Sequence, residues 1–170
     1  MDNVCHSLAG AVLAECGFAQ RTRWATTTMV IGANLPDIDV VSLFFGDLTG
    51  LEFRRGWTHG VLAMVVLPLA LIGAILLRER FAGNRATAPP LNARVLLAAA
   101  VLSVWSHPVL DWLNTYGVRL LMPFSEQWFY GDTLFIIDLV LLALFGTGWW
   151  LSRLSRRRGE PRATRPARLA

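Results

Sequence analysis

Long apolar runs separated by short polar segments are the main pattern along this chain. The runs at residues 60–77, 93–113 and 133–151 are each about long enough to cross a lipid bilayer as a helix. A weaker run covers residues 24–45, and residues 3–19 are apolar but short. The pattern predicts an all-α, polytopic membrane helical bundle of four or five transmembrane or re-entrant helices. Residues 3–19 form either a short span or a re-entrant helix.

A proline or ionisable residues interrupt several of these runs. Pro68 lies inside the 60–77 run, where a membrane helix tolerates it. His107 and Asp111 lie near the end of the 93–113 run, and Asp37 and Asp39 lie within the 24–45 run. Residues 78–94 contain four arginines, one acid and a Pro-Pro pair, which is typical of a loop. We expect one membrane-embedded domain at residues 1–151 and a disordered, arginine-rich tail at residues 152–170.

Composition supports a membrane protein over a soluble domain. Hydrophobic residues make up 54% of the chain and charged residues only 16%, and the mean hydropathy is +0.45. The two cysteines, Cys5 and Cys16, are too few for a disulfide framework and match no zinc-binding spacing. Residues 1–20 lack the basic start of a secretory signal peptide, so we expect no cleavable signal there.

The arginines predict how the chain is oriented in the membrane. All 16 basic residues are arginines, and seven of them lie in the tail after residue 151. By the positive-inside rule, the tail and the 78–94 loop are cytoplasmic and the 114–132 loop is periplasmic. A basic tail after a hydrophobic helix favours this interpretation over nucleic-acid binding, so the expected partners are membrane lipids. Arg54 and Arg55 oppose the rule in a short outer loop, which makes them functional candidates.

This topology brings the ionisable residues of separate segments to one membrane face. Five ionisable residues lie at the outer ends of their segments: His107, Asp111, His59, Asp37 and Asp39. His6 joins them if residues 3–19 cross, and Asp132 and Asp138 enter from the same side. Because ionisable groups are costly inside a bilayer, they usually face each other or a water-filled cavity.

These residue types suit a metal ion. His107 and Asp111 are four residues apart, so they share one helix face, and imidazole nitrogen with carboxylate oxygen suits zinc. The alternative is a polar pair at a helix end that Pro108 kinks. Asp37 and Asp39 are two residues apart and need a cation to relieve their repulsion, unless they only form a cap or turn.

Other polar residues have candidate roles around such a site. Arg54 and Arg55 carry the planar donors that recognise phosphate or carboxylate, although they can also contact lipid headgroups. Thr58 is a candidate N-cap for the 60–77 helix, and Asp132 for the last helix. Asp138 lies further along that helix and is a candidate for orienting a ligand histidine.

Five motifs together carry a family resemblance: "DNVCHSLAG", "GANLPDID", "RRGWTHG", "SHPVLDWLNTYGVRLLMPF" and "WFYGDTLFIID". The set resembles the YdjM-like family of bacterial inner-membrane proteins, which are described as metal-dependent hydrolases. The resemblance covers about residues 1–145 and leaves the tail outside. It implies metal-site positions at His6, Asp37, His59, His107 and Asp111, with Asp39 as a further one. Many relatives carry a histidine where this chain has Arg54. More loosely, the set is similar to the helical zinc phospholipase C and P1 nuclease group.

We therefore expect a membrane-embedded metal-dependent hydrolase that acts on a phosphoester or lipid headgroup at the outer face of the inner membrane. Zinc is the expected ion, with magnesium or manganese as alternatives. Asp39 or Asp138 would serve as general base, and Arg54 and Arg55 would bind an anionic substrate, with Arg55 also assisting catalysis. Two rival functions remain: a metal or proton transporter, and a non-catalytic membrane module with a structural metal.

Overall fold

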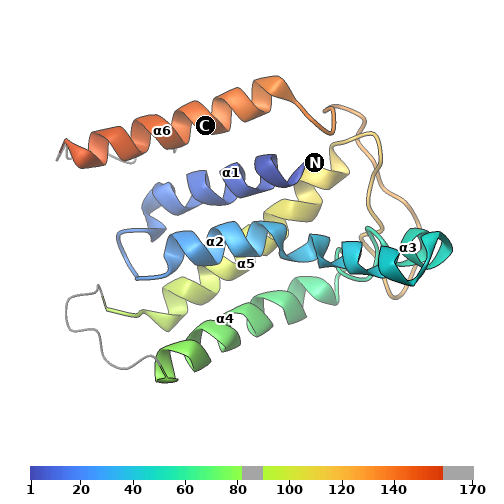
Figure 1. The fold of residues 1–170 in the computed structure, drawn as a ribbon, viewed down its shortest axis with the longest axis horizontal. Coiled ribbons are helices and arrows are strands. Elements are labelled where there is room, and N and C mark those ends of the chain that lie inside the picture. The colour runs from blue at the N-terminus through green and yellow to red at the C-terminus, as the bar shows by residue number, and fades with distance from the viewer. Residues whose placement is uncertain (82–89, 159–170) are drawn as a thin grey trace.

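The computed structural model describes residues 1–81 and 90–158, and its regular structure is helical (Figure 1). Within these ranges the chain forms no named strand, and only two isolated β-bridges occur. The elements, in chain order, are α1 (Asn3–Leu13), the π-helix η1 (Ala14–Phe18), α2 (Ala25–Asn34), the 3-10 helix η2 (Leu35–Phe45), α3 (Asp47–Phe53), α4 (Ala63–Phe81), α5 (Ala93–Trp112) and α6 (Leu139–Arg157). The expected all-helical class is confirmed.

Two of the expected spans have clear counterparts. The predicted 93–113 helix is α5, and the predicted 24–45 segment is the continuous run of α2 and η2. Both Ala25–Phe45 and Ala93–Trp112 are long and apolar enough to cross a membrane, with mean hydropathies of 1.4 and 1.5. Pro36, which lacks a backbone N–H, lies at the point where the α-helix tightens into the 3-10 helix. Among the described helices only these two reach that standard, so the expected count of four or five spans stays a prediction.

The predicted bounds of the last helix were wrong at its start. The helix begins at Leu139 instead of residue 133, because the preceding segment is extended and bonds to the end of α5. Gly131 N donates to Trp112 O at 2.6 Å, and Leu134 N donates to Leu113 O at 3.0 Å. The N-cap is Asp138, whose side chain accepts from Leu141 N, and not Asp132. The helix continues to Arg157, past the expected start of the tail, and residues 159–170 lie outside the described part of the chain.

The fourth helix also begins later than predicted, at residue 63 instead of 60. Val61 N donates to Leu120 O at 2.9 Å, which ties the chain to a distant segment just before the helix starts. Thr58, the expected N-cap, instead bonds to side chains of the polar site described below. The predicted 78–94 loop begins within α4, which runs to Phe81, and its residues 82–89 lie outside the described ranges.

The fifth helix is the centre of the bundle and packs against α1, α2 and α4, while α6 packs on α1 and η1 (Figure 1). Buried aliphatic side chains of α4 and α5 form one core cluster: Leu71, Ile72, Ile75, Leu96 and Ala100. The approach of α1 to α2 is close at Gly10, where an added Cβ would lie 2.4 Å from Met29 O. Small residues at such crossings let membrane helices pack tightly.

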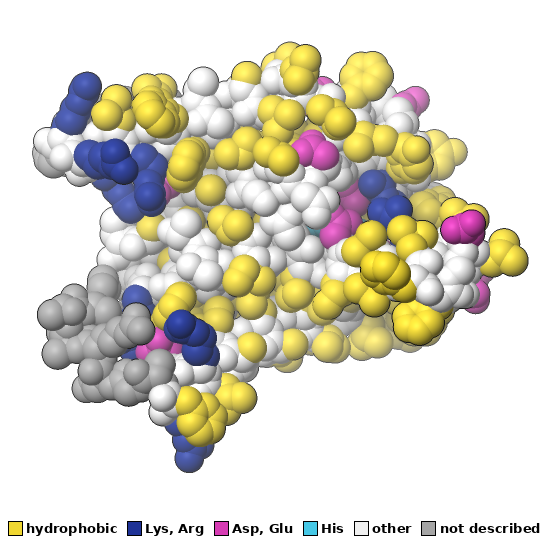
Figure 2. Space-filling model, in the orientation of Figure 1, with side chains coloured by type: hydrophobic (Ala, Val, Ile, Leu, Met, Phe, Trp, Pro, Cys, Tyr) yellow, Lys and Arg dark blue, Asp and Glu magenta, His cyan; other side chains and the backbone are white. Residues whose placement is uncertain are grey.

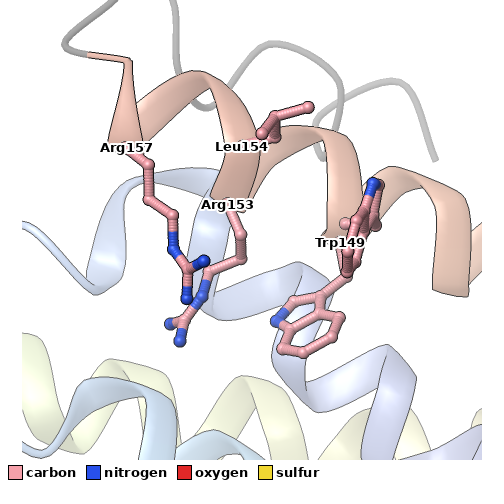
Figure 3. A pocket seen from close by; sticks show the side chains of 5 residues that line it. Trp149, Arg153, Leu154 and Arg157 are labelled. Atoms are coloured by element: carbon pink, nitrogen blue, oxygen red, sulfur yellow. The ribbon is translucent and has the colours of Figure 1, made fainter.

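The last turns of α4 and α6 carry Arg78, Arg80, Arg156 and Arg157. These two helix ends lie at the end of the bundle opposite α3 and the N-terminus (Figure 1). Glu15 is fully buried there, and its carboxylate lies 3.3 Å from Arg156 Nη1 and 3.9 Å from Arg153 Nη1. Figure 3 shows Trp149, Arg153 and Arg157 on the side of α6 that faces the neighbouring helices, with Leu154 on the opposite side. The structure thus separates a basic end from the polar site at the other end, as the sequence predicts.

Candidate metal centre

Side chains from η2, the turn before α4, and α5 meet in a compact group. We call Asp37, His59, His107 and Asp111 the His–Asp cluster. One ligand atom of each lies within 4.8 Å of all the others. The Nε2 atoms of His59 and His107 are 3.0 Å apart. Asp111 Oδ2 is 3.5 Å from His59 Nε2 and 3.6 Å from His107 Nε2. Asp37 Oδ1 is 3.6 Å from His107 Nε2.

Four of the six separations among these ligand atoms are close to those of a tetrahedral metal site, and all six are within 4.8 Å. Zinc takes nitrogen and oxygen ligands at about 2.0–2.1 Å, so the ligand atoms of a tetrahedron lie about 3.3–3.4 Å apart. The four separations above range from 3.0 to 3.6 Å. Two imidazole nitrogens and two carboxylate oxygens are also a donor set that zinc accepts. The residues present therefore fit a divalent ion in both chemistry and spacing.

The orientation of His107 is set by the backbone of α2. Its Nδ1 lies 2.6 Å from Ala33 O, which is a hydrogen-bond acceptor only. Nδ1 therefore carries the proton and donates it to Ala33 O, and the lone pair of a neutral ring lies on Nε2. A metal-ligating histidine commonly donates its second nitrogen in this way, which fixes the tautomer and the ring orientation.

The orientation of His59 is set by Asp39 and Thr58. His59 Nδ1 lies 3.0 Å from Thr58 Oγ1 and 3.5 Å from Asp39 Oδ2. Asp39 is itself held, because its Oδ2 accepts from Arg55 N at 2.7 Å and from Thr58 Oγ1 at 3.1 Å. Burial lowers the pKa of His59 below its usual value, which favours the neutral imidazole that binds metals. These contacts give Asp39 a positioning role for His59.

The two carboxylate oxygens of Asp111 face different partners. Oδ1 forms an ion pair with the amino group of Met1 and lies 3.3 Å from both His6 Nε2 and Asn114 Nδ2. Oδ2 faces His59 and His107 and has no hydrogen-bond partner among the described residues, although the side chain is 1% exposed. A buried carboxylate oxygen without a partner is costly unless a cation neutralises it. This oxygen is therefore the natural ligand atom of Asp111.

His6 lies against the cluster rather than within it. Its ring stacks on that of His107, with centroids 3.7 Å apart and planes inclined by 17°. Neither ring nitrogen makes a hydrogen bond within the described residues, although the side chain is fully buried. The structure thus brings the predicted ligand His6 to the site, with Nε2 directed at Asp111.

The guanidinium group of Arg55 borders the cluster. Its Nη2 lies 3.7 Å from Asp111 Oδ2, and its Nη1 donates to Asn114 Oδ1 and Gly117 O at 3.2 and 3.1 Å. Arg55 adopts a left-handed backbone conformation with a φ of 54°, which is unusual outside glycine. The hydrogen bond from the backbone N–H of Arg55 to Asp39 Oδ2 helps to hold this conformation.

Two other predicted site residues make their hydrogen bonds away from the cluster. Asp138 caps α6, so its carboxylate accepts a backbone hydrogen bond there. Arg54 contributes its carbonyl oxygen, which accepts from Arg119 Nη2 at 3.1 Å. The general-base role of Asp138 and the substrate contact of Arg54 remain predictions without support from this geometry.

Asn114 and Arg119 support the site; the sequence predicts that Asn114 shapes it, but it does not single out Arg119 for that role. Arg119 is 6% exposed and donates to the carbonyls of Glu52 and Arg54, while its backbone N donates to Arg55 O. Asn114 Oδ1 accepts from the amides of Tyr116 and Gly117 as well as from Arg55. The sequence does contain one sign of a special role for Arg119, because it is the only arginine between residues 95 and 152.

Comparison with known proteins places the chain among inner membrane proteins. The family model described as "YdjM inner membrane protein" matches residues 1–166, which extends beyond the expected 1–145 into the basic tail. The "Inner membrane protein YbcI" of Escherichia coli (strain K12) is 34% identical over 105 residues, covering 59% of this chain and 54% of that protein.

A second relative is the "Uncharacterized protein YfhP" of Bacillus subtilis (strain 168). It is 27% identical over 124 residues, covering 69% of this chain and 35% of that protein. The chain therefore spans about a third to about half of the length of these curated relatives. No solved structure matches the chain.

Proposed function

The chain belongs to the YdjM inner membrane protein family, and we propose that it is a membrane-embedded, metal-dependent hydrolase of phosphoesters. The observation that carries this proposal is the His–Asp cluster, in which ligand atoms of two histidines and two aspartates lie within 4.8 Å of one another, a donor set that zinc accepts. A bound divalent ion would supply Lewis-acid activation of water and of the ester bond.

The reaction proposed is simple hydrolysis. The oxygen of water bonds to phosphorus, and the bond between phosphorus and the alcohol oxygen breaks. One proton of the water ends on the released alcohol, and the other remains with the phosphate product. Water and a phosphoester are thus the only reactants, and no oxidant or reductant takes part.

The chain's own residues have distinct parts in this proposal. The ion would be held by His59, His107, Asp37 and Asp111. His6 would support Asp111 through its contact with Oδ1, the carboxylate oxygen that faces away from the ion. Asp39 and Thr58 keep His59 in the tautomer that presents Nε2. Arg55 would bind an anionic oxygen of the substrate, because its guanidinium lies beside Asp111 and charged donors stabilise phosphate in the transition state. The contacts of Asp39 favour positioning over the general-base role expected from the sequence.

We also propose the membrane arrangement. The segments Ala25–Phe45 and Ala93–Trp112 would cross the inner membrane together with α4 and α6. The shorter α1 would cross only part of the bilayer thickness. The arginine-rich end would face the cytoplasm, because basic residues favour that side. The His–Asp cluster would then lie near the outer face.

Two rival functions use the same residues. A structural metal would link η2, the turn before α4, and α5 without catalysis, and a transporter would carry the ion across. The basic end disfavours transport, because Glu15 is already compensated by Arg153 and Arg156 rather than presented to a passing cation.

The test is metal analysis and hydrolysis on the same purified protein in detergent. We expect about one divalent ion for each chain and release of phosphate or alcohol from phosphoesters, both lost after chelation and restored by zinc, magnesium or manganese. Metal without hydrolysis of phosphoesters would support the structural role. Absence of bound metal after purification with added zinc would defeat the proposal.

A further inference from the structure

The His–Asp cluster reaches the surface at a single ligand, Asp37. The Asp37 side chain is 16% exposed, whereas those of His59 and His107 are fully buried and that of Asp111 is 1% exposed. His6 and Asp39, which lie behind these residues, are at most 3% exposed. A substrate that reaches a metal ligand of this group therefore meets Asp37 first.

A shallow, open cavity of about 450 Å³ lies on the Asp37 side of the cluster. Its walls come from the start of α1 and from the junction of α2 with η2. Polar lining residues are Asn3, Asn34 and Asp37, and aliphatic ones include Val30, Ile31 and Ile38. Small-molecule sites commonly have this size and this mixture of apolar walls with a few polar groups.

The mouth of this cavity lies on an apolar side surface of the bundle. Ile31 is 44% exposed and Ile38 is 55% exposed at its rim, and Val4 of α1 is 61% exposed. The apolar surface continues along η2 and α3 through exposed side chains that include Val41, Phe44, Phe45, Leu48 and Leu51. Figure 2 shows carboxylate atoms on this face, next to Lys or Arg atoms and bordered by hydrophobic side chains. In a membrane protein, an exposed apolar surface faces the acyl chains of lipids.

We propose that this cavity is a lateral entrance through which a phosphate-bearing lipid of the outer leaflet reaches the His–Asp cluster. The proposal rests on the function proposed above and names its substrate class. The lipid's acyl chains would lie against Val30, Ile31 and Ile38, where they remain in an apolar environment. Its phosphate group would lie at the edge marked by Asp37, with Asn3 and Asn34 as neutral polar neighbours.

The apolar walls distinguish this source of phosphate from a water-soluble one. A soluble phosphoester gains nothing from aliphatic walls, whereas a lipid exchanges bilayer contacts for equivalent ones at little cost. The neutral amides Asn3 and Asn34 also add no charge that would attract small anions from water.

The test uses the full chain in lipid nanodiscs that contain a phosphatidylglycerol with a photoreactive group on its acyl chain. After illumination, the cross-linked peptides are identified by mass spectrometry. We expect cross-links concentrated on residues 30–38 and on the start of α1. An excess of water-soluble glycerophosphate should leave them unchanged. Cross-links spread evenly over the lipid-facing helices, or displaced by glycerophosphate, would overturn the proposal.

Matched variants sharpen this test. Ile38→Trp and Ile31→Trp place bulk at the rim and should reduce cross-linking in the cavity by about tenfold. Leu69→Trp, at a position that is 54% exposed on α4, is the control and should leave the cross-links at wild-type level. Metal content of each variant shows whether the cluster is intact. An unchanged yield in both rim variants would also overturn the entrance.

The two proposals fail in different ways. Cross-linking does not require hydrolysis. Cavity cross-links in a chain that never hydrolyses phosphoesters would therefore contradict the proposed hydrolase activity and support the proposed lipid entrance. Hydrolysis of soluble phosphoesters without cavity cross-links would retain the enzyme and defeat the lateral entrance.

Discussion

His59 and His107 are 48 positions apart in the chain, yet their Nε2 atoms lie 3.0 Å from each other. The opposite nitrogen of each ring is engaged: His107 Nδ1 with Ala33 O, and His59 Nδ1 with Thr58 and Asp39. When both rings are neutral and donate through Nδ1, two lone pairs face one another. A shared cation relieves this arrangement.

Replacing Asp111 by asparagine should remove the bound metal and the hydrolysis while the protein still inserts and folds. The amide keeps the shape of the side chain but loses the charge that a hard cation needs. Metal content and circular dichroism of the purified variant measure the two properties. Trp112→Phe is the neighbouring control, because Trp112 is 43% exposed and should leave metal content unchanged. Full metal occupancy in Asp111→Asn would make Asp111 a structural residue.

Asp39→Asn should weaken metal binding by about 10–100-fold, as is typical when a partner of a ligand histidine is lost. The carboxylate of Asp39 holds His59, Thr58 and the amide of Arg55 in place. Titration of the metal-free protein with zinc would measure the change. Asp47→Asn on exposed α3 is the matched control. Wild-type affinity in Asp39→Asn would show that His59 needs no such support.

Arg55→Lys should raise the KM for a phosphoester substrate and lower kcat/KM by about tenfold. Lysine keeps the positive charge but has one nitrogen, so it cannot both donate to Asn114 and Gly117, as Nη1 does, and present a second donor beside Asp111, as Nη2 does. Steady-state kinetics would measure both constants, with metal content as the check that the cluster persists. An unchanged KM would place the substrate away from Arg55.

Glu15→Gln should destabilise the attachment of α6 to η1. Removing the buried charge leaves the nearby guanidinium of Arg156 without its partner, at a cost of about 1–3 kcal/mol. Thermal unfolding in detergent and protease sensitivity of α6 would report the effect. Glu126→Gln, in the exposed segment before α6, should show no change.

A cysteine at position 125 should react with a membrane-impermeant thiol reagent added outside the cell, whereas a cysteine at position 158 should react only after the membrane is opened. The expected topology rests on the arginines of the 78–94 loop and the tail. The background is a variant in which Cys5 and Cys16 are replaced by alanine. The reverse labelling pattern would invert the orientation and place the His–Asp cluster near the cytoplasm.

The sequence by itself determined the helical class and the gathering of polar residues at one end of the bundle. The run at residues 93–113 predicted α5 almost to the residue, because an apolar segment of membrane-spanning length has few alternatives to a helix and tolerates Pro108 within it. The i, i+4 spacing put His107 and Asp111 on one face of that helix, and this follows from helix geometry alone. The predicted topology placed Asp37, His59 and, if residues 3–19 cross, His6 at the same membrane face, and the family resemblance named them as metal-site positions. The structure brings all three to the same site.

The tertiary structure decided which polar residue does what. Asp39 and Asp37 are two residues apart, yet one turns to His59 and the other to His107, because η2 winds as a 3-10 helix after Pro36. Asp138 became a helix cap because residues 131–134 bond to the end of α5 instead of starting the last helix. Such outcomes depend on hydrogen bonds between segments far apart in sequence, which local hydrophobic periodicity cannot predict. The exposed edge at Asp37 likewise exists only because α1 and α2 leave a cavity beside it.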